Sequence, residues 1–424
     1  MKKVLIISYY WPPAGGPGVQ RWLKFAKYLP QFGFEPIILT VHPDEATYPV
    51  RDESLLGETS KMEVHHTSTS ELFGTYQKAS GRKEVPYSGF ANESDKPGPR
   101  QKLAKFVRGN FFIPDPRKGW NKHAIPKALE LIDKYQITNV VTTSPPHSTQ
   151  LIGLKLKQQR AINWLADLRD PWTDIYYYHQ FYPTKVAQKI DAGLERKVLE
   201  QADNVACVSA DIKRLFAEKS KDINPEKIVV LPNGFDAQDF EAEVAEVPES
   251  DFLICYTGTI TSDYKVETFL EVLKRLQKTT ERKIRLQFIG KRDEQTEKLL
   301  KEYDGDFKIE LLGLVSHKEA VQVMKSCHAL LLAIPKIKNN EGILTGKIFE
   351  YLAAQKPIIG IGPSHGDAAQ ILTETAAGAM LDYDSKDEMY SFIEQLIQKK
   401  WSHQSSSIQY SRENLTGTLT KLFS

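Results

Sequence analysis

The sequence predicts an α/β protein with two Rossmann-like domains, each a parallel sheet covered by helices. Short apolar runs of strand length alternate with amphipathic runs of helix length along the whole chain, a pattern typical of β/α repeats. The 424 residues are enough for two domains of ordinary size. A Pro-Asn-Gly turn at 232–234 separates two β/α series and marks the border between the domains.

Ten apolar runs are predicted to be strands, and they fall into two groups. The first group lies at 4–8, 36–41, 139–143, 161–166 and 204–209, with helices expected at 19–32, 125–135 and 148–159. The second group lies at 252–257, 284–289, 309–312, 329–333 and 357–361. We therefore expect an N-terminal domain over 1–235, a C-terminal domain over 236–402 and a helix within the tail at 403–424.

Composition and charge exclude several classes of protein. Hydrophobic residues make up 41% of the chain and charged residues 26%, as in ordinary globular proteins, and the net charge is only +2. A net charge this small gives no general attraction to nucleic acid, so we expect no such partner. Cys207, Cys255 and Cys327 lack metal-ligand or CxxC spacing and lie in apolar runs, which indicates buried thiols in a reducing compartment.

We expect neither a signal peptide nor a transmembrane segment. The apolar run at 4–8 is too short for a signal peptide, and bulky aromatic and proline residues follow it. No window of the sequence approaches the length of a transmembrane helix. These patterns predict a cytoplasmic protein that at most touches the inner face of a membrane.

One segment, 78–118, is unlike the β/α repeats and is predicted to be a basic insertion in the first domain. It is rich in Gly and Pro, carries ten Lys and Arg against four Asp and Glu, and has aromatic residues interleaved. A long insertion of this composition suits anionic lipid headgroups or an acceptor that bears phosphate. The alternative is a solvated loop with a few anchoring aromatic residues.

The segment 341–359 predicts a loop, a helix, a turn and a strand, and it carries the strongest functional signal. Thr345 and Gly346 lie where the helix begins, so its first backbone N–H groups are unpaired and form a site for an anion. Lys347 and Glu350 follow on one face of the helix, and a carboxylate at Glu350 suits a ribose diol. Together these residues predict binding of a nucleotide diphosphate.

Two further turns of the second half predict positive charge near the same ligand. Gly258 ends the strand at 252–257, and Lys265 follows where a helix starts. Gly290 and Lys291 end the next strand. Lys265 and Lys291 are predicted to neutralise the diphosphate. The alternative for Lys265 is a solvated lysine at a helix start.

In the first half, Gly15 and Gly16 form a glycine-rich turn between the first strand and the first helix. Their spacing does not match GxGxxG, but such a turn still brings backbone N–H groups close to a ligand. His147 follows the strand at 139–143, at the carboxyl edge where ligands bind in open α/β sheets. The alternatives are a tight turn for the glycines and a structural role for the histidine.

Asp167, Arg169 and Asp170 end the strand at 161–166. Three charges within four residues are unfavourable at the edge of a sheet unless they are paired or used. Asp170, Arg169 and His147 are candidate catalytic residues, and Asp170 can take a proton from a reacting hydroxyl. A buried Asp–Arg pair is the competing interpretation for Asp167 and Arg169, and it is favoured for Asp167.

Three segments resemble GT-B-fold glycosyltransferases of the family 4-like, group 1 kind. The stretch 346–357 is similar to their donor-site pattern Gly-Lys-x-x-Glu-Tyr-x-Ala-Ala-x-Lys-Pro, 231–236 to their interdomain element, and 167–172 to an Asp-x-Arg-Asp-x-Trp segment. The chain departs from the family at Gly342, where Glu is usual, and at Thr259, where Arg or Lys is usual.

The resemblance implies two domains facing a cleft, with a UDP- or GDP-linked nucleotide-sugar in the second and a glycan or lipid-linked acceptor in the first. It also implies retention of anomeric configuration, no cofactor, no metal ion, and a terminal helix that crosses back to the first domain. We therefore predict a retaining, hexosyltransferase-like glycosyltransferase of cell-surface polysaccharide or glycolipid synthesis. The alternatives are a sugar-nucleotide epimerase and a non-catalytic nucleotide-sugar-binding protein.

Overall fold

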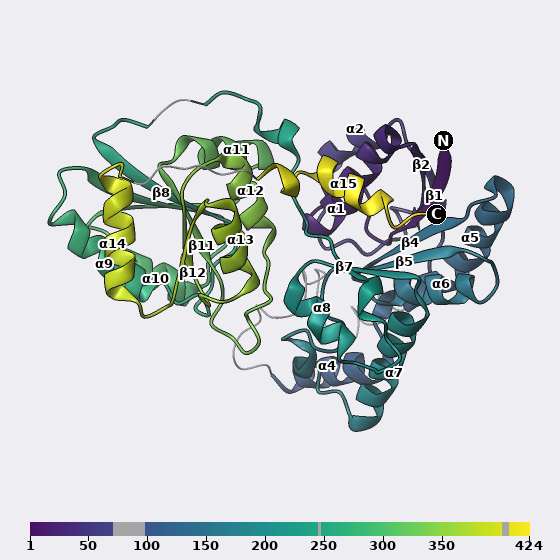
Figure 1. The fold of residues 1–424 in the computed structure, drawn as a ribbon. Coiled ribbons are helices and arrows are strands. Elements are labelled where there is room, and N and C mark those ends of the chain that lie inside the picture. Colours follow the sequence, from purple (N-terminus) through teal and green to yellow (C-terminus); the bar gives the residue numbers. More distant parts are fainter. Residues whose placement is uncertain (71–97, 245–246, 401–406) are drawn as a thin grey trace. The chain divides into compact units, whose positions relative to one another are not determined.

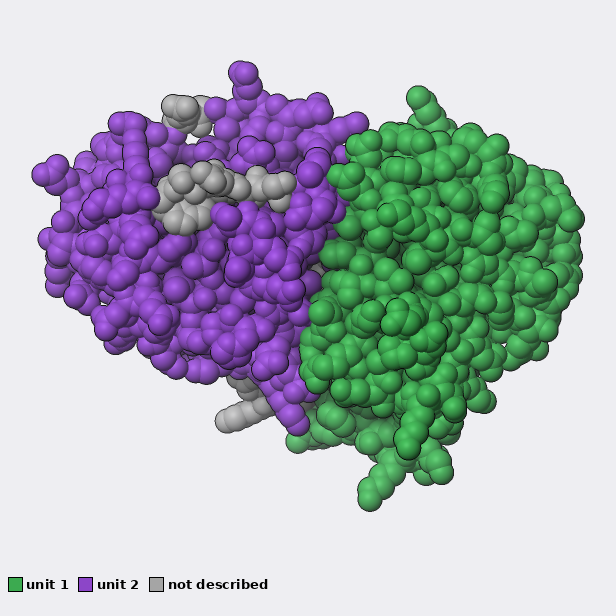
Figure 2. All heavy atoms as spheres, viewed as in Figure 1, with its two compact units in different colours: residues 1–232, 413–424 green, residues 233–412 purple. Residues whose placement is uncertain are grey.

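The computed structural model describes residues 1–70, 98–244, 247–400 and 407–424 (Figure 1). The chain forms two compact units, shown in separate colours in Figure 2: Met1–Pro232 with Glu413–Ser424 is unit 1, and Asn233–Arg412 is unit 2. Each unit is built on one parallel sheet covered by helices, which confirms the predicted α/β fold class. The units divide after Pro232, whereas the sequence predicts the border after residue 235.

Unit 1 contains a seven-stranded parallel sheet in the order β3-β2-β1-β4-β5-β6-β7. Its strands are β1 (Lys2–Ile7), β2 (Phe34–Val41), β3 (Glu63–Thr67), β4 (Asn139–Ser144), β5 (Asn163–Leu168), β6 (Asn204–Cys207) and β7 (Ile228–Val230). Its helices are α1 (Pro17–Tyr28), α2 (Leu56–Thr59), α4 (Pro99–Phe111), α5 (Asn121–Tyr135), α6 (Ser148–Lys157), α7 (Lys185–Gln201) and α8 (Ala210–Ala217).

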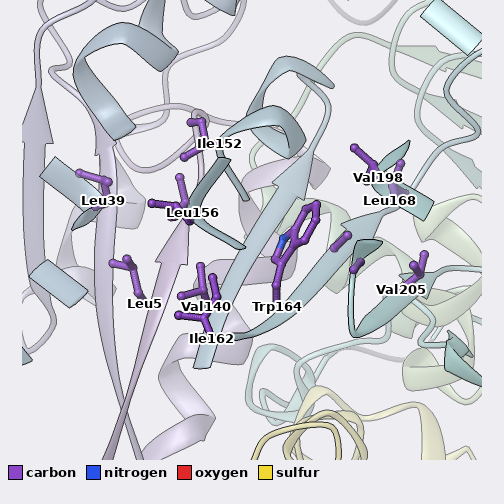
Figure 3. Packing of buried hydrophobic residues seen from close by; sticks show 14 of the residues in the cluster. Leu5, Leu39, Val140, Ile152, Leu156, Ile162, Trp164, Leu168, Val198 and Val205 are labelled. Carbon is purple, nitrogen blue, oxygen red and sulfur yellow. The ribbon is translucent and has the colours of Figure 1, made fainter. Parts of the chain in front are cut away.

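The central strands of unit 1 are apolar on both faces because helices cover both sides of the sheet. Successive side chains of a strand point to opposite faces. Leu5 and Ile7 of β1 therefore pack in one core, together with residues of α5 and α6, and Figure 3 shows part of this core around Trp164. Val4 and Ile6 pack in a second core with residues of α1.

The chain terminus completes this second core. Helix α15 (Arg412–Thr420) begins in unit 2, and its remaining residues belong to unit 1. Leu415 and Leu419 are buried there with residues of α1. The Ser424 amide then donates to Oδ1 of Asn139 at the start of β4 (2.9 Å), so the chain end is tied to the sheet of unit 1.

Unit 2 contains a six-stranded parallel sheet in the order β10-β9-β8-β11-β12-β13. Its strands are β8 (Asp251–Thr257), β9 (Lys283–Ile289), β10 (Lys308–Leu312), β11 (Ala329–Ala333), β12 (Ile358–Ile361) and β13 (Gly378–Leu381). Its helices are α9 (Glu267–Gln277), α10 (Glu294–Tyr303), α11 (His317–Ser326), α12 (Gly346–Ala354), α13 (Asp367–Thr375) and α14 (Lys386–Ile397). The three cysteines are free and buried, as predicted.

Two expectations about the elements need correction. All ten predicted strands are present, but β3, β7 and β13 were not predicted, because they are short or lack an apolar pattern. The segment 78–118 is not a loop throughout, because Pro99–Phe111 forms α4. Pro99 at its first position and the Gly98 amide, which donates to Oε1 of Gln101 (3.1 Å), favour this helix start. Residues 78–97 of the insertion lie outside the described residues.

The described helices give no candidate for a membrane span. Within residues 1–70, 98–244, 247–400 and 407–424, no helix combines the length and the apolar character that crossing a bilayer requires.

Candidate active site

The start of α12 in unit 2 is an open helix N-terminus. Thr345 is its N-cap in an extended conformation, and its side chain does not cap the helix. The Thr345 Oγ1 is buried and makes no hydrogen bond within the described residues. A Cβ placed on Gly346 would meet nothing within 4 Å. The helix therefore presents unpaired backbone N–H groups and open space to an anion.

The Lys347 ammonium lies at the turn after β8, next to this helix start. Its Nζ donates to the Tyr256 hydroxyl (2.6 Å) and lies 4.3 Å from the centre of that ring. The Tyr256 hydroxyl in turn donates to the Thr259 carbonyl (2.7 Å). Burial lowers the pKa of Lys347 from 10.5 to about 7. An anionic ligand would restore the ordinary charge of this lysine, because a neighbouring negative charge favours the protonated form.

Glycine is required at this turn for two reasons. Gly258 has φ of +106°, and a Cβ there would lie 2.5 Å from Cε of Lys347. Gly290, at the end of β9, has φ of +131°, and a Cβ there would lie 2.3 Å from the Gly258 carbonyl oxygen. The structure therefore stacks Gly290, Gly258 and Lys347 tightly at the carboxyl edge of the sheet.

Two other lysines, Lys291 and Lys265, were predicted to neutralise the diphosphate, and their environments differ from that of Lys347. The Lys291 side chain is exposed and makes no hydrogen bond or ion pair with the described part of the chain, while its carbonyl accepts from the Ile260 amide (3.0 Å). The half-buried Lys265 donates to the Ser262 carbonyl (2.7 Å) in the turn that precedes α9. The cation that the structure places on the Gly258 turn is Lys347.

Replacing Lys265 by Ala is expected to lower turnover more than it lowers thermal stability. Within the described residues the Lys265 side chain donates to one carbonyl oxygen, so its removal should disturb packing little. A lysine near a departing diphosphate, by contrast, stabilises developing charge. Steady-state kinetics and a thermal melt of the same preparation check this. Unchanged turnover would assign Lys265 to the solvated surface.

Glu350 lies one turn into α12 and is half-buried. Its Oε1 is 4.0 Å from Nδ1 of His317, the first residue of α11, and Nε2 of that ring is 3.4 Å from the Asp239 carboxylate. Burial raises the pKa of Glu350, and His317 and Arg412 oppose that rise. Sequence reasoning missed His317, since nothing in the local pattern links it to α12.

Replacing Glu350 by Gln should leave the fold intact and weaken donor binding by about 1.5–3 kcal/mol, as for the loss of a charge-assisted hydrogen bond. The side chain keeps its size, so packing of the helix is preserved. Isothermal calorimetry with a nucleotide-sugar measures the change. Donor affinity equal to that of the wild type would remove Glu350 from the donor site.

In unit 1, His147 lies between β4 and α6 and stacks on Trp172. The two ring centroids are 4.9 Å apart and the planes differ by 10°. Burial, aided by the nearby Arg169, lowers the pKa of His147 to about 3. Its Nδ1 is buried and has no partner within the described residues. The imidazole is therefore neutral near pH 7 and can orient a hydroxyl, but it does not act as a cation.

The structure brings Arg169 to the glycine-rich turn. Its Nε donates to the Ser144 carbonyl (3.1 Å), and its guanidinium lies over Gly18, where a Cβ would be 2.7 Å from Nη1. Gly16 is the N-cap of α1, with φ of +99°. The Gly15 amide, by contrast, donates to the Val50 carbonyl (2.9 Å), so this N–H group is not open to a ligand.

Asp170 is half-buried beside these groups and makes no hydrogen bond with the described part of the chain. Burial raises the pKa of the Asp170 carboxyl, and the nearby negative charge of Asp167 raises it further. The positive charges of Arg169 and Arg21 oppose this rise in pKa. A carboxylate with a raised pKa is a stronger base than an exposed one. The position and the direction of this shift both suit acceptance of a proton.

Asp167 is structural, and its partner is Arg21 of α1. Both side chains are fully buried, and Oδ1 of Asp167 lies 2.8 Å from Nη2 of Arg21. The same carboxylate accepts from Nε1 of Trp22 (2.6 Å) and from Oγ1 of Thr143 (2.7 Å). The favoured buried Asp–Arg pair thus exists, but Arg21 provides the cation instead of Arg169.

Two buried carboxylates of helix α7 accept hydrogen bonds from the loop after Asp170 and hold that loop in place. The Trp172 indole donates to Asp191 (2.7 Å), and the Thr173 hydroxyl donates to Glu195 (2.5 Å). Burial raises the pKa of Asp191 to about 6. These contacts fix the Trp172 ring, on which His147 stacks. The sequence did not reveal them, because α7 has only the pattern of an ordinary amphipathic helix.

The described residues contain no group of three or more His, Cys, Asp or Glu side chains arranged to hold a metal ion.

Two family models match the chain in segments that overlap at residues 237–239. Residues 82–239 match Glycosyltransferase Family 4, and residues 237–414 match Glycosyl transferases group 1. Together they extend over 82–414, the greater part of both units. The chain belongs to the group 1 glycosyltransferases of the family 4-like type. No curated protein sequence matched it.

Solved structures with the same fold extend over nearly the whole chain. A sucrose-phosphate synthase from Thermosynechococcus elongatus is 14% identical, with a TM-score of 0.59 over 100% of this chain and 98% of its own. Anabaena Alr3699/HepE, solved with UDP and glucose, is 12% identical, with a TM-score of 0.58 over 99% of both chains. A glycosyltransferase from Rickettsia africae is 16% identical, with a TM-score of 0.55 over 100% and 94%. These similarities identify the fold as GT-B.

Proposed function

We propose that this glycosyltransferase moves a sugar from a UDP- or GDP-linked donor to an acceptor hydroxyl with retention of configuration. The observation that carries the donor assignment is the open start of α12 with the Lys347 ammonium beside it at the Gly258 turn. Backbone N–H groups and one cation suit a diphosphate, and Glu350 lies one turn further for the ribose. The UDP and glucose bound to Anabaena HepE support this donor class.

In the proposed reaction, the bond between the anomeric carbon and the diphosphate oxygen breaks, and the acceptor oxygen bonds to that carbon on the face that the diphosphate leaves, which retains the configuration. The nucleoside diphosphate leaves with the electron pair, and Lys347 and the α12 amides stabilise its charge. The acceptor proton passes to a base, for which we propose Asp170. Neutral His147 orients the acceptor hydroxyl, and Arg169 holds the anionic part of a ligand at the start of α1.

We further propose a glycan or lipid-linked acceptor, in the synthesis of cell-surface polysaccharide or glycolipid. The support is the excess of Lys and Arg over Asp and Glu in 78–118, which suits a phosphate-bearing acceptor. A lipid-linked acceptor requires peripheral contact with an anionic membrane, and we propose this contact as part of the function.

A donor screen tests the proposal. Calorimetry with UDP-, GDP- and ADP-sugars should give one tight class, and that donor should then release its nucleoside diphosphate over many turnovers when an acceptor is added. Proton NMR of the product reports the anomeric configuration. Tight binding without turnover would indicate a non-catalytic binding protein, and a changed sugar on the nucleotide would indicate an epimerase.

A further inference from the structure

Exposed apolar side chains of unit 1 gather on α4, on α7 and on the segment just before α7. We name this set the α4–α7 surface; its members are Leu103, Phe106, Phe111, Tyr176, Tyr182, Val186 and Ile190. Phe111 and Val186 are 76% and 69% exposed. A folded protein rarely leaves so many large apolar groups together in water unless they contact a partner.

The end of α4 is tied to the start of α7, so the exposed side chains of the two helices lie on neighbouring elements. Nδ2 of Asn110, near the end of α4, donates to the Tyr182 carbonyl (3.0 Å), and its Oδ1 accepts from the Thr184 amide (2.8 Å), where Thr184 is the N-cap of α7. A Cβ on Gly109 would lie 2.3 Å from the Phe181 carbonyl oxygen. Figure 1 shows α4 beside α7 in unit 1.

The charge around these apolar groups is positive. Helix α4 contains no acidic residue, and its cations Arg100 and Lys102 are exposed, whereas Arg108 is half-buried over the Phe181 ring and Lys105 is buried. On α7 the cations Lys185, Lys189, Arg196 and Lys197 are exposed, whereas Asp191 and Glu195 are buried against the loop after Asp170. The third acidic residue of α7, Glu200, is half-buried near its end and lies 3.6 Å from Arg196. The outward face of both helices therefore combines apolar and basic side chains and lacks fully exposed carboxylates.

We propose that the α4–α7 surface docks on an anionic lipid bilayer, with its apolar side chains at the headgroup boundary and its Lys and Arg on lipid phosphates. Amphipathic helices that lie in a membrane interface have this combination, whereas lysine is depleted at protein–protein interfaces. The proposal rests on the proposed peripheral contact with a membrane and extends that contact to α7, outside 78–118. It requires no donor, so docking and sugar transfer can fail separately.

Co-sedimentation of the full chain with lipid vesicles tests the docking. The vesicles contain phosphatidylcholine alone or phosphatidylcholine mixed with phosphatidylglycerol, each at low and high salt. We expect strong binding to the anionic vesicles at low salt and weak binding to the neutral ones. High salt should weaken the anionic binding without abolishing it, because salt screens the charges and leaves the apolar contacts.

Two paired variants assign the binding to this surface. Phe111→Ser with Val186→Ser should weaken vesicle binding by about tenfold or more, since both side chains would leave the interface. Lys185→Gln with Lys189→Gln should weaken it about thirtyfold at low salt. The controls are Leu314→Ser, which removes a 72% exposed side chain of unit 2, and the exposed pair Lys61→Gln with Lys278→Gln.

Three outcomes would overturn the proposal. The first is equal, weak binding to both kinds of vesicle. The second is binding to anionic vesicles that neither paired variant changes more than its control, which would place the contact elsewhere. The third is self-association that Phe111→Ser with Val186→Ser abolishes, without vesicle binding, which would make the surface an interface between copies. Thermal melts confirm that each variant is folded.

Discussion

Replacing Asp167 by Asn is expected to lower the free energy of unfolding of unit 1 by about 3–5 kcal/mol, as for a broken buried ion pair. Asn keeps the shape and still accepts from Trp22 and Thr143. It removes the charge that faces Arg21, whose side chain is fully buried and whose Nη2 and Nε lie 2.8 and 3.2 Å from the Asp167 carboxylate. A buried guanidinium would then lack the carboxylate that neutralises its charge, although its Nη1 still donates to the Pro232 carbonyl (2.9 Å).

Urea unfolding followed by circular dichroism measures this change, and Asp133→Asn is the matched control. Asp133 also pairs with an arginine, Arg160, at 2.7 Å, but the two side chains are 54% and 39% exposed. Losing this exposed pair should change the free energy of unfolding little, because water and salt screen the two charges. A similar small cost for Asp167→Asn would contradict the role of the buried pair. Arg21→Met combined with Asp167→Asn should recover part of the loss.

The sequence predicted the fold well where buried strands are long and apolar. Strand β11 has the predicted bounds, because Ala-Leu-Leu-Leu-Ala is buried on both faces. The edge strand β3 reads Glu-Val-His-His-Thr and is only partly buried, so it carries no apolar signal. Helix α4 was not predicted, because the segment 78–118 was assessed by its overall content of Gly, Pro and charged residues. The shorter stretch Pro99–Phe111 within it has a helical pattern of its own.

The candidate site was predictable where its residues share one element. Gly346, Lys347 and Glu350 lie on α12 and were found together. The contact of Lys347 with the Gly258 turn joins residues far apart in the sequence, and no local pattern contains it. Arg21 was likewise hidden, since a basic residue in an amphipathic helix is usually solvated and its partner lies 146 positions away. Shifted pKa values depend on burial, which only the folded chain defines.

Replacing Lys347 by Met is expected to reduce turnover by about 100–1000-fold, the usual effect of removing one group that stabilises transition-state charge. The methionine side chain fills most of the space over Gly258 and Tyr256, so the fold should persist. The ammonium that we propose to face the departing diphosphate would be lost. Single-turnover kinetics with a saturating donor isolate this effect from donor affinity, and the exposed Lys278→Met is the control.

The pH dependence of donor binding gives a second, sharper test of Lys347. Its pKa of about 7 in the free protein means that the ammonium is charged below pH 7 and largely neutral above it. A bound diphosphate raises this pKa, so binding takes up a proton above pH 7. Affinity should therefore be constant at low pH and should fall by about tenfold for each pH unit well above 7. Tyr256 faces the ammonium and stays neutral, because burial raises its pKa well above the ordinary value.

Calorimetry in buffers with different ionisation enthalpies measures the proton directly. We expect uptake of about one proton per donor at pH 8 and almost none at pH 6, because only the neutral lysine has a proton to gain. A nucleotide-sugar is the right ligand, since its diphosphate is a diester and does not titrate in this range. Lys347→Met should abolish the uptake and flatten the affinity profile. Glu350→Gln should lower affinity, keep the uptake at pH 8 and move the fall in affinity to lower pH, because the Glu350 carboxylate raises the pKa of Lys347. Proton uptake that persists in Lys347→Met would place the titrating group elsewhere in unit 2 and remove Lys347 from the diphosphate site.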